Sequence, residues 1–435
     1  SDGFLTFQLA KYLNPNESRM VTITYGLEAT KVDLTTLSPA GDVGYSENVL
    51  QFVNWYPQLV PYRPGFGWIR WPDVDPDWNI VSEVSDYQLV VRVFDEIYVA
   101  SGGPVENRGN DWYFQMQNAR SIAFSASPDY KLKTSTEAGV TIYLFHLPDD
   151  SFAADAVLNA TTRSLVLFND RYGHYPYRSL VIAQNHYRSS IASGGLLLHS
   201  GQGFETYSGQ PDSLLMVLVP LTLSQLWWGE VVGYDHITEP WIGASFAMYS
   251  EYMYVAEYFS DKKEWFWTDR IDYWQPDGPL NTTVYNMDNR QQMLRNTYRR
   301  GARFLHELHN EMGDPNFRRF TRDLFRRGAF QILDGTEFFN TLRKHTTEYP
   351  EEIIARYFDK NIEMPIVKPA LTPIFNLGQS PTATPVQRIH EVQVGDTLTS
   401  LAIQYEVPMQ MIIDRNRIVD PTILQIGTKL VIPYP

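Results

Sequence analysis

The stretch from residue 219 to residue 251 constrains the fold of this chain more than any other. It reads Val-Pro-Leu-Thr-Leu-Ser-Gln-Leu-Trp-Trp-Gly-Glu and, after a short connection, Pro-Trp-Ile-Gly-Ala-Ser-Phe-Ala-Met-Tyr-Ser-Glu. The pattern predicts two helices close together in the chain. Leu221 and Gln225 stand four residues apart, so they share one face of the first helix. Ala244 lies on the second helix.

This stretch resembles the active-site segment of zinc aminopeptidases of the aminopeptidase N family. Those enzymes have His-Glu-x-x-His-x-Trp-x-Gly on one helix and, eighteen residues after the second His, a Glu in Trp-Leu-x-Glu-Gly-Phe-Ala. The comparison is anchored on Trp227, Trp228 and Gly229. It puts Leu221 at the first His, Thr222 at the general base and Gln225 at the second His. Ala244 falls at the ligand glutamate.

These four substitutions predict that the family's zinc chemistry is lost. A catalytic zinc needs three protein ligands and one open position, but leucine and alanine donate nothing and a glutamine amide is a poor ligand. Without the metal, a bound water is not acidified. Thr222 cannot replace a carboxylate base near neutral pH. We therefore expect no metal, no cofactor and no peptidase activity, although Pro220 fits the first turn of the helix and allows it to form.

Two further elements of the family pattern are present only in outline. The exopeptidase signature Gly-x-Met-Glu-Asn is expected where Ser193-Gly194-Gly195-Leu196-Leu197-Leu198 stands, which places Leu197 at the glutamate that binds a free amino group. Thr297-Tyr298-Arg299-Arg300-Gly301-Ala302 resembles the family's Tyr-x-Lys-Gly-Ala helix start. Tyr298 matches the oxyanion-stabilising tyrosine, but the favoured interpretation is a packed tyrosine at a helix start.

Composition and pattern divide the 435 residues into a multidomain chain. Residues 1–150 predict an antiparallel β domain, with strands at Met20–Tyr25 and Tyr87–Val93. This part resembles the family's N-terminal β domain, and the resemblance implies that its first strands are missing. Residues 151–365 resemble the mainly helical, thermolysin-like α+β domain, and residues 366–388 form a Pro/Thr-rich linker. The net charge of −14 argues against nucleic acid as the main partner.

Residues 389–435 resemble a LysM domain, which implies a small βααβ fold that binds peptidoglycan or chitin-like glycan. The expected elements are a strand at Glu391–Val394, a helix capped by Asp396 or Thr397, a helix at Met409–Asn416 and a strand at Lys429–Ile432. The resemblance places glycan binding in two loops, made of Gly395, Asp396, Thr397, Leu398 and of Ile423, Leu424, Gln425, Ile426, Gly427. A single module of this kind binds weakly unless several act together.

Other polar clusters invite weaker interpretations. His306 and His309 are three residues apart and lack a third ligand, so we expect them to flank a buried stripe. His236 and Glu239 are interpreted as helix-start capping. The arginine run from Arg295 to Arg327 predicts a solvated face, with docking of an acidic partner as the alternative.

Together these features predict a secreted, non-catalytic protein at the cell wall or cell surface. We expect a peptide or protein partner in a dry, apolar former cleft, and a homo-oligomer through the β edge near residues 4–30. An active peptidase with a rebuilt site, or a surface-layer or filament subunit, remains the alternative.

Overall fold

The computed structural model describes residues 17–32, 43–63, 67–68, 82–94, 96–185, 190–360, 388–393, 396–405, 409–416, 418 and 427–432. The chain divides into two compact units, residues 1–374 and residues 375–435. Residues 4–16 of the expected β edge, nearly all of the linker at 366–388, and the predicted loop residues Gly395 and Ile423–Ile426 lie outside the described residues.

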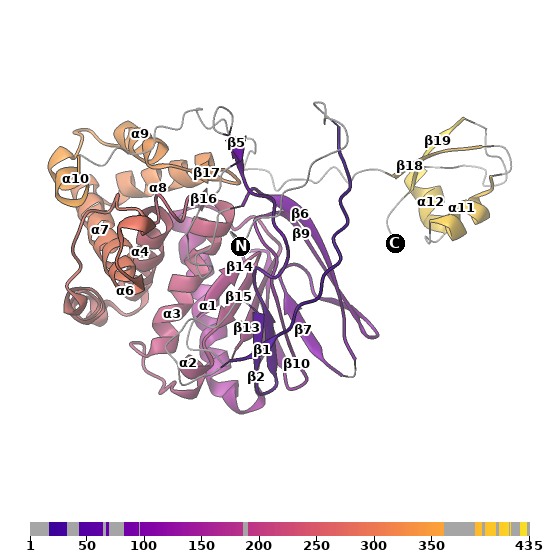
Figure 1. Ribbon diagram of the computed structural model, residues 1–435, viewed down its shortest axis with the longest axis horizontal. Coiled ribbons are helices and arrows are strands. Elements are labelled where there is room, and N and C mark those ends of the chain that lie inside the picture. Colours follow the sequence, from indigo (N-terminus) through magenta and orange to yellow (C-terminus); the bar gives the residue numbers. More distant parts are fainter. Residues whose placement is uncertain are drawn as a thin grey trace. The chain divides into compact units, whose positions relative to one another are not determined.

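The N-terminal part of the larger unit is a β sandwich (Figure 1). One sheet has the order β1-β2-β3-β10-β7, with the bounds Thr30–Lys31, Val43–Ser46, Val49–Phe52, Phe124–Ser127 and Tyr98–Ser101. The other has the order β6-β9-β8, with the bounds Ser85–Arg92, Asp111–Ala119 and Glu106–Arg108. Leu89, Trp112, Phe114 and Phe124 pack between them. A short pair, β4 (Tyr62–Arg63) with β5 (Gly67–Trp68), stands apart.

A third sheet is mixed and crosses the boundary expected at residue 150. Its order is β11-β12-β13-β15-β14, with the bounds Lys131–Glu137, Val140–His146, Ser179–Gln184, Leu196–His199 and Ile191–Ser193. The strands β12, β13 and β15 run parallel, and β14 pairs antiparallel with β15 at the edge. Because β13 and β15 are buried along their whole length, they read as continuous apolar runs.

Helices form the rest of the larger unit, and α1 and α3 pack beside the mixed sheet (Figure 1). The α-helices are α1 Ser151–Arg171, α2 Gly201–Glu205, α3 Leu214–Ser224, α4 Trp241–Tyr258, α5 Lys263–Trp265, α6 Arg290–Met293, α7 Gly301–Met312, α8 Asp314–Gly328, α9 Gly335–His345 and α10 Glu351–Tyr357. Short or irregular turns are η1 Pro148–Asp150, η2 Leu226–Val231, η3 Ser260–Lys262, η4 Phe266–Ile271, η5 Asp272–Trp274, η6 Val284–Asn286 and η7 Leu294–Arg300. The strands β16 (Gly233–Tyr234) and β17 (Ile332–Leu333) tie α3 to α8.

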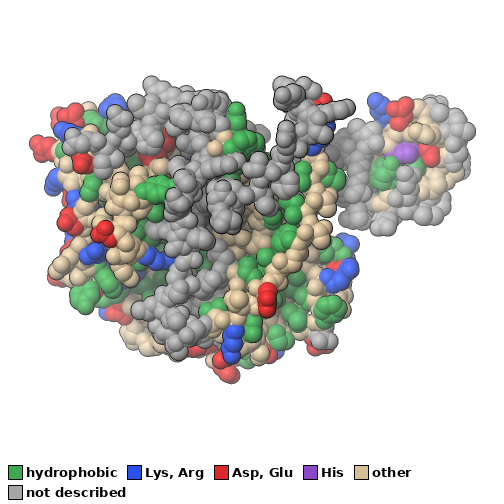
Figure 2. All heavy atoms as spheres, in the orientation of Figure 1, with side chains coloured by type: hydrophobic (Ala, Val, Ile, Leu, Met, Phe, Trp, Pro, Cys, Tyr) green, Lys and Arg blue, Asp and Glu red, His purple; other side chains and the backbone are tan. Residues whose placement is uncertain are grey.

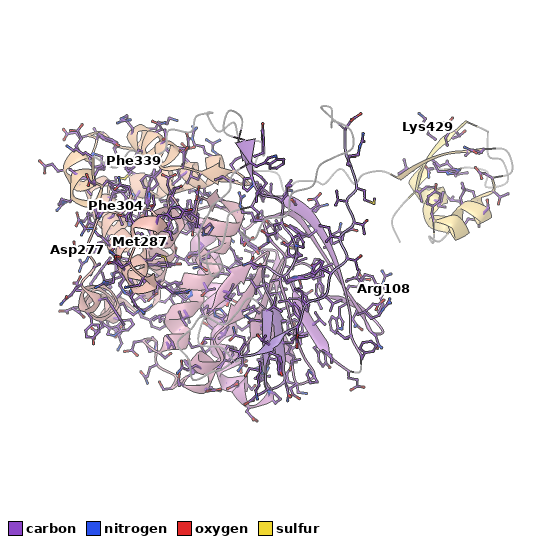
Figure 3. All side chains as sticks on the ribbon, in the orientation of Figure 1. Arg108, Asp277, Met287, Phe304, Phe339 and Lys429 are labelled. Atoms are coloured by element: carbon purple, nitrogen blue, oxygen red, sulfur yellow. The ribbon has the colours of Figure 1, made fainter. Side chains whose placement is uncertain are left out.

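Aromatic side chains fill the space between these helices. Phe304 of α7 and Phe339 of α9 lie in the helical region (Figure 3). Both pack against Phe358, each with ring centroids 5.1 Å apart. Trp241, at the start of α4, contacts Phe338 and Phe358 at 5.0 Å. Buried aromatic rings thus pack α4 against α7 and α9.

The helix that carries Leu221 differs from expectation at both ends. It begins at Leu214, so Pro220 lies in its interior and not at its first turn. A proline there removes one backbone hydrogen bond, which the surrounding apolar packing must offset. The helical path then breaks in η2, where Trp228 has φ −109° and ψ 64°. Trp228 stacks on Phe246 of α4 with centroids 3.9 Å apart, which holds the break in place.

Two glycines fix the sandwich to the mixed sheet by direct backbone contact. A Cβ on Gly102 would lie 1.6 Å from the carbonyl oxygen of Gly194. A Cβ on Gly194, which has φ +48°, would lie 2.0 Å from the carbonyl oxygen of Ser121. Only glycine allows such an approach.

The smaller unit has the βααβ order predicted for it. Its elements are β18 Arg388–Glu391, α11 Leu398–Gln404, α12 Met409–Asn416 and β19 Lys429–Ile432. Leu398 and Leu401 are buried beside Ile412, Leu430 and Ile432. The first strand ends before the expected Val394.

The N-terminal described residues differ from expectation. Residues 17–29 contain no strand, so the strand predicted at Met20–Tyr25 is wrong, and Met20 is 94% exposed.

Among the described residues, one segment, Leu214–Val231, is long and apolar enough to cross a membrane, but 67% of it is buried inside the protein. A core helix has the same properties, so this finding carries little weight.

Candidate functional site

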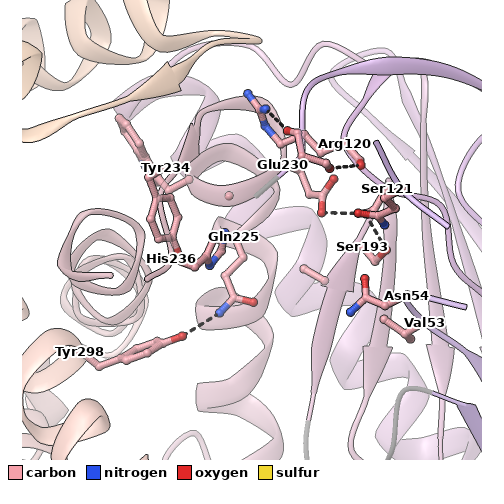
Figure 4. A pocket seen from close by; sticks show the side chains of 15 residues that line it. Val53, Asn54, Arg120, Ser121, Ser193, Gln225, Glu230, Tyr234, His236 and Tyr298 are labelled. Carbon is pink, nitrogen blue, oxygen red and sulfur yellow. Dashed lines mark hydrogen bonds between the residues drawn. The ribbon is translucent and has the colours of Figure 1, made fainter. Parts of the chain in front are cut away.

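A polar cavity of about 140 Å³ lies where the β sandwich, the mixed sheet and the helical region meet (Figure 4). Its wall is made of Val53, Asn54, Gln58, Ser82, Arg120, Ser121, Ala192, Ser193, Gln225, Trp228, Gly229, Glu230, Tyr234, His236 and Tyr298. The charged side chains of this wall are one carboxylate and one guanidinium. The cavity adjoins the break in η2, and Trp228, Gly229 and Glu230 of that turn form part of its wall.

Glu230 is the carboxylate of the cavity wall. Its Oε1 accepts a hydrogen bond from the Ser121 hydroxyl at 3.1 Å, and the Ser121 and Ser193 hydroxyls lie 2.7 Å apart. Its Oε2 is buried without a hydrogen-bond partner. Burial raises the pKa of this carboxyl, and the Gly194 backbone N–H, the Ser121 hydroxyl and the Arg120 charge oppose the rise only in part.

Arg120 is the guanidinium of the wall and is held in place by backbone carbonyls. Nη1 donates to the Ser82 carbonyl and Nη2 to the Gln331 carbonyl, both at 2.6 Å. The guanidinium packs on Gly233, where a Cβ would lie 2.4 Å from Cζ. Burial lowers the pKa of Arg120, but an arginine remains charged at neutral pH.

His236 faces the cavity as a neutral ring. It stacks on Tyr234 with centroids 4.2 Å apart, and no described residue forms a hydrogen bond with its ring nitrogens. Burial, together with the nearby Arg120 charge, lowers the pKa of His236 to about 4. The interpretation of His236 as a helix-start cap is wrong, because Asp235 caps this turn by accepting from the Ile237 and Thr238 amides. Glu239 instead accepts from the Gly335 amide at 2.8 Å.

Of the predicted site residues, Gln225 and Tyr298 meet at the cavity. The Gln225 amide donates to the Tyr298 hydroxyl at 3.4 Å (Figure 4). Burial raises the pKa of Tyr298, so its hydroxyl stays protonated at neutral pH. Tyr298 therefore reaches the cavity and is more than a packed helix-start residue.

The other predicted positions stand back from the cavity. Thr222 is 1% exposed and Ala244 is 3% exposed, on the packed helices α3 and α4. Leu221 is half-buried. Leu197 is fully buried in β15, opposite Ala192 on the edge strand β14. Ala192 and Ser193 of that edge strand line the cavity in its place.

The residues at these positions do not fit a zinc ion. Leu221 and Ala244 have no donor atom, and Gln225 offers one amide oxygen. Over the described ranges, no group of three or more His, Cys, Asp or Glu side chains could hold a metal. His306 and His309 flank the buried face of α7 as expected, and His309 bonds to Tyr249 at 2.7 Å.

The cavity is polar, whereas the cleft expected from Leu221, Ala244 and Leu197 was dry and apolar, but those three side chains do not line this cavity. Its wall includes Arg120 and Ser121, which directly follow β9 and lie about 110 residues before Glu230 in the sequence. No local sequence pattern links these residues. The one available signal was Glu230 itself, a charged residue inside the apolar run from Leu226 to Val232.

The arginine run is largely paired within the protein itself. Arg318 bonds to Asp170, Arg322 to the Asp170 carbonyl, and Arg326 and Arg327 to Asp323. Figure 2 shows acidic and basic side chains interspersed over the helical region. This favours the solvated face over docking of an acidic partner.

The first loop of the smaller unit uses its side chains internally. The Ser400 amide donates to the Thr397 hydroxyl at 3.0 Å, and the Thr397 amide to the Ser400 hydroxyl at 2.9 Å, so Thr397 is the helix cap. Asp396 Oδ2 accepts from the Gln393 amide and lies 2.7 Å from His390 Nε2. His390 Nδ1 lies 2.9 Å from the Tyr405 hydroxyl. Gly427, at the second loop, has φ +84°.

Comparison with known families agrees with both resemblances. Residues 206–360 match the peptidase family M1 domain, and residues 390–433 match the LysM domain. The sequence-based assignments to an aminopeptidase-like protein with a C-terminal LysM domain, and the fold class, are thereby confirmed.

Individual relatives are distant. Endoplasmic reticulum aminopeptidase 1 of Mus musculus is 23% identical over 238 residues, which are 51% of this chain and 24% of that protein. Probable aminopeptidase 2 of Sulfurisphaera tokodaii is 24% identical over 169 residues, 36% of this chain and 21% of that protein. The chain thus spans about a quarter or less of these relatives. An M1 zinc metallopeptidase from Deinococcus radiodurans shares the fold, with a TM-score of 0.53 and 15% identity over 79% of this chain and 76% of that one.

Proposed function

We propose that this chain, whose residues 206–360 form a peptidase family M1 domain and whose residues 390–433 form a LysM domain, is a non-catalytic binding protein of the cell wall. It is secreted, its LysM domain attaches it to N-acetylglucosamine-containing glycan, and its peptidase-like domain holds a peptide in the polar cavity. The two family matches together support the coarser statement that this is a peptidase-like protein that associates with cell-wall glycan.

The observation that carries this proposal is the donor set on α3 and α4. The three zinc ligands of the family are replaced by Leu221, Gln225 and Ala244, of which only Gln225 has a donor atom, and a weak one. The general base is replaced by the buried hydroxyl of Thr222. A zinc hydrolase needs the metal to make its nucleophile at neutral pH. The carboxylate that does face the cavity, Glu230, is tied to Ser121 and has no metal partner among the described side chains.

The test combines metal content, activity and retention on the wall. Purified protein, before and after incubation with zinc, is subjected to elemental analysis, and aminopeptidase substrates are assayed with and without chelator. We expect less than stoichiometric zinc and no chelator-sensitive turnover. The full chain should be retained on insoluble peptidoglycan, while a chain ending at residue 387 should not.

The results separate the rival functions. Stoichiometric zinc with chelator-sensitive cleavage contradicts the non-catalytic assignment. Cleavage that survives chelator supports the alternative of a rebuilt, metal-free site, for which Glu230 and His236 are the titratable groups at hand. Equal retention of the full and shortened chains contradicts attachment through the LysM domain.

A further inference from the structure

The charge balance of the cavity limits what can bind in it. Arg120 and Glu230 are the charged residues of the wall, and they carry opposite charges. A ligand with one net charge would leave that charge uncompensated in a buried site, which is strongly unfavourable. An uncharged end group meets no such penalty.

Three other polar groups of the wall are uncharged at neutral pH. The Gln225 amide, the Tyr298 hydroxyl and the His236 ring are each partly exposed, and each can both donate and accept hydrogen bonds. Glu230 Oε2 adds a buried acceptor that has no hydrogen-bond partner. The wall therefore offers donors and acceptors together, which an amide group, with one N–H and one C=O, can satisfy.

The size of the cavity sets how much of a ligand it takes. At about 140 Å³ it is smaller than the pockets of 300–1,000 Å³ that enclose drug-sized ligands. It can receive the end of a peptide but not several residues. Ala192 and Ser193 of the edge strand β14 line the same wall.

Building on the peptide-binding role proposed above, we infer that the cavity receives an uncharged, N-acylated peptide end and discriminates against a free, protonated amino terminus. The discrimination arises because Glu230 is already balanced by Arg120. Leu197, fully buried in β15, offers the cavity no second carboxylate.

The test uses the full-length protein and two probes that differ in one acyl group. N-acetyl-alanine amide and alanine amide are titrated at pH 7 and followed by isothermal calorimetry or saturation-transfer NMR. We expect the acetylated probe to bind at least tenfold more tightly. The α-amino group titrates near pH 8, so raising the pH to 9.5 should neutralise alanine amide and narrow the difference.

Two variants show whether binding occurs in this cavity. Tyr298→Phe removes a hydroxyl from the wall and should weaken the acetylated probe severalfold. Tyr273→Phe removes the same group from a side chain that is 75% exposed outside the cavity, and should change nothing. Loss of binding in Tyr298→Phe only, together with the pH effect, supports the inference.

The remaining outcomes overturn the inference in distinguishable ways. Equal or tighter binding of alanine amide at pH 7 refutes the charge argument and leaves a peptide-binding cavity standing. Binding of neither probe, or equal loss in both variants, removes the cavity as a peptide site. Wall retention and metal content still test the proposed function separately.

Discussion

Replacing Arg270 by alanine tests how the helices around the cavity are held together. Arg270 of η4 donates to both carboxylate oxygens of Glu251 on α4, at 2.7 and 2.8 Å. Glu251 is fully buried, and Arg270 also accepts a hydrogen bond from Arg299, the neighbour of Tyr298. The substitution leaves a buried carboxylate without a partner.

The expected loss is about 3–5 kcal/mol of unfolding free energy, the range for breaking one side of a buried ion pair. At about 2 °C per kcal/mol for a domain of this size, the midpoint should fall by about 6–10 °C. Urea and thermal unfolding, followed by tryptophan fluorescence and circular dichroism, measure both values. The double variant Glu251→Leu, Arg270→Met should recover most of the loss, since it removes the charge as well as its partner.

A matched control has the same geometry at the surface. Arg92 donates to Asp111 at 2.6 and 2.7 Å, but the Arg92 side chain is 72% exposed. We expect no measurable effect of Arg92→Ala. Equal losses in Arg270→Ala and Arg92→Ala, or a double variant as unstable as Arg270→Ala alone, would refute the argument that burial decides the effect.

Three further predictions concern packing, acid stability and glycan binding. Gly301→Ala places a Cβ 1.9 Å from the Ser245 hydroxyl, so urea unfolding should show a loss of about 1–3 kcal/mol, whereas Gly26→Ala, with nothing within 4 Å, should be neutral. Burial would raise the pKa of Asp323, but hydrogen bonds from His345, Arg326 and Arg327 lower it to about 2. The ionised Asp323 carboxylate stabilises the fold above about pH 4, and this stabilisation is lost as the pH falls to 2. Between pH 4 and pH 2, the unfolding free energy of Asp323→Asn should therefore change less than that of the wild type. His390→Phe removes two hydrogen bonds that hold the first glycan loop, so retention on peptidoglycan should fall severalfold, while His390→Gln should keep part of it; unchanged retention in both contradicts the loop assignment.

The sequence predicted the parts of this protein whose signals are local. The spacing of Leu221, Gln225 and Ala244 from the Trp-Trp-Gly anchor located α3 and α4, and the LysM pattern gave α12 and β19 to the residue. These succeed because helix periodicity and turn residues act over a few neighbouring positions. The proposed loss of catalysis and the oligomer expected near residues 4–30 stay predictions.

The cavity itself could not be predicted in this way. Arg120 and Glu230 are brought together by contacts between the sandwich and η2, and a break at Trp228 decides where Glu230 points. A regular helix through Gly229 would have aimed that side chain elsewhere. The prediction that Pro220 lies in the first turn of the helix was wrong for a related reason. Tertiary packing keeps this proline in the interior of α3, against its local preference.

The glycine contact between Gly102 and Gly194 has a consequence for how the cavity is entered. Backbone touches backbone there, and Gly194 touches Ser121, whose hydroxyl belongs to the cavity wall. The β sandwich therefore cannot rotate away from the mixed sheet as a rigid body unless these close backbone contacts are broken. The cavity proposed to bind a peptide is therefore rigid before binding, so little conformational entropy remains to be lost. The selectivity of a preformed cavity depends on its shape and charge. Binding to it should follow one-step kinetics without a slow closing phase.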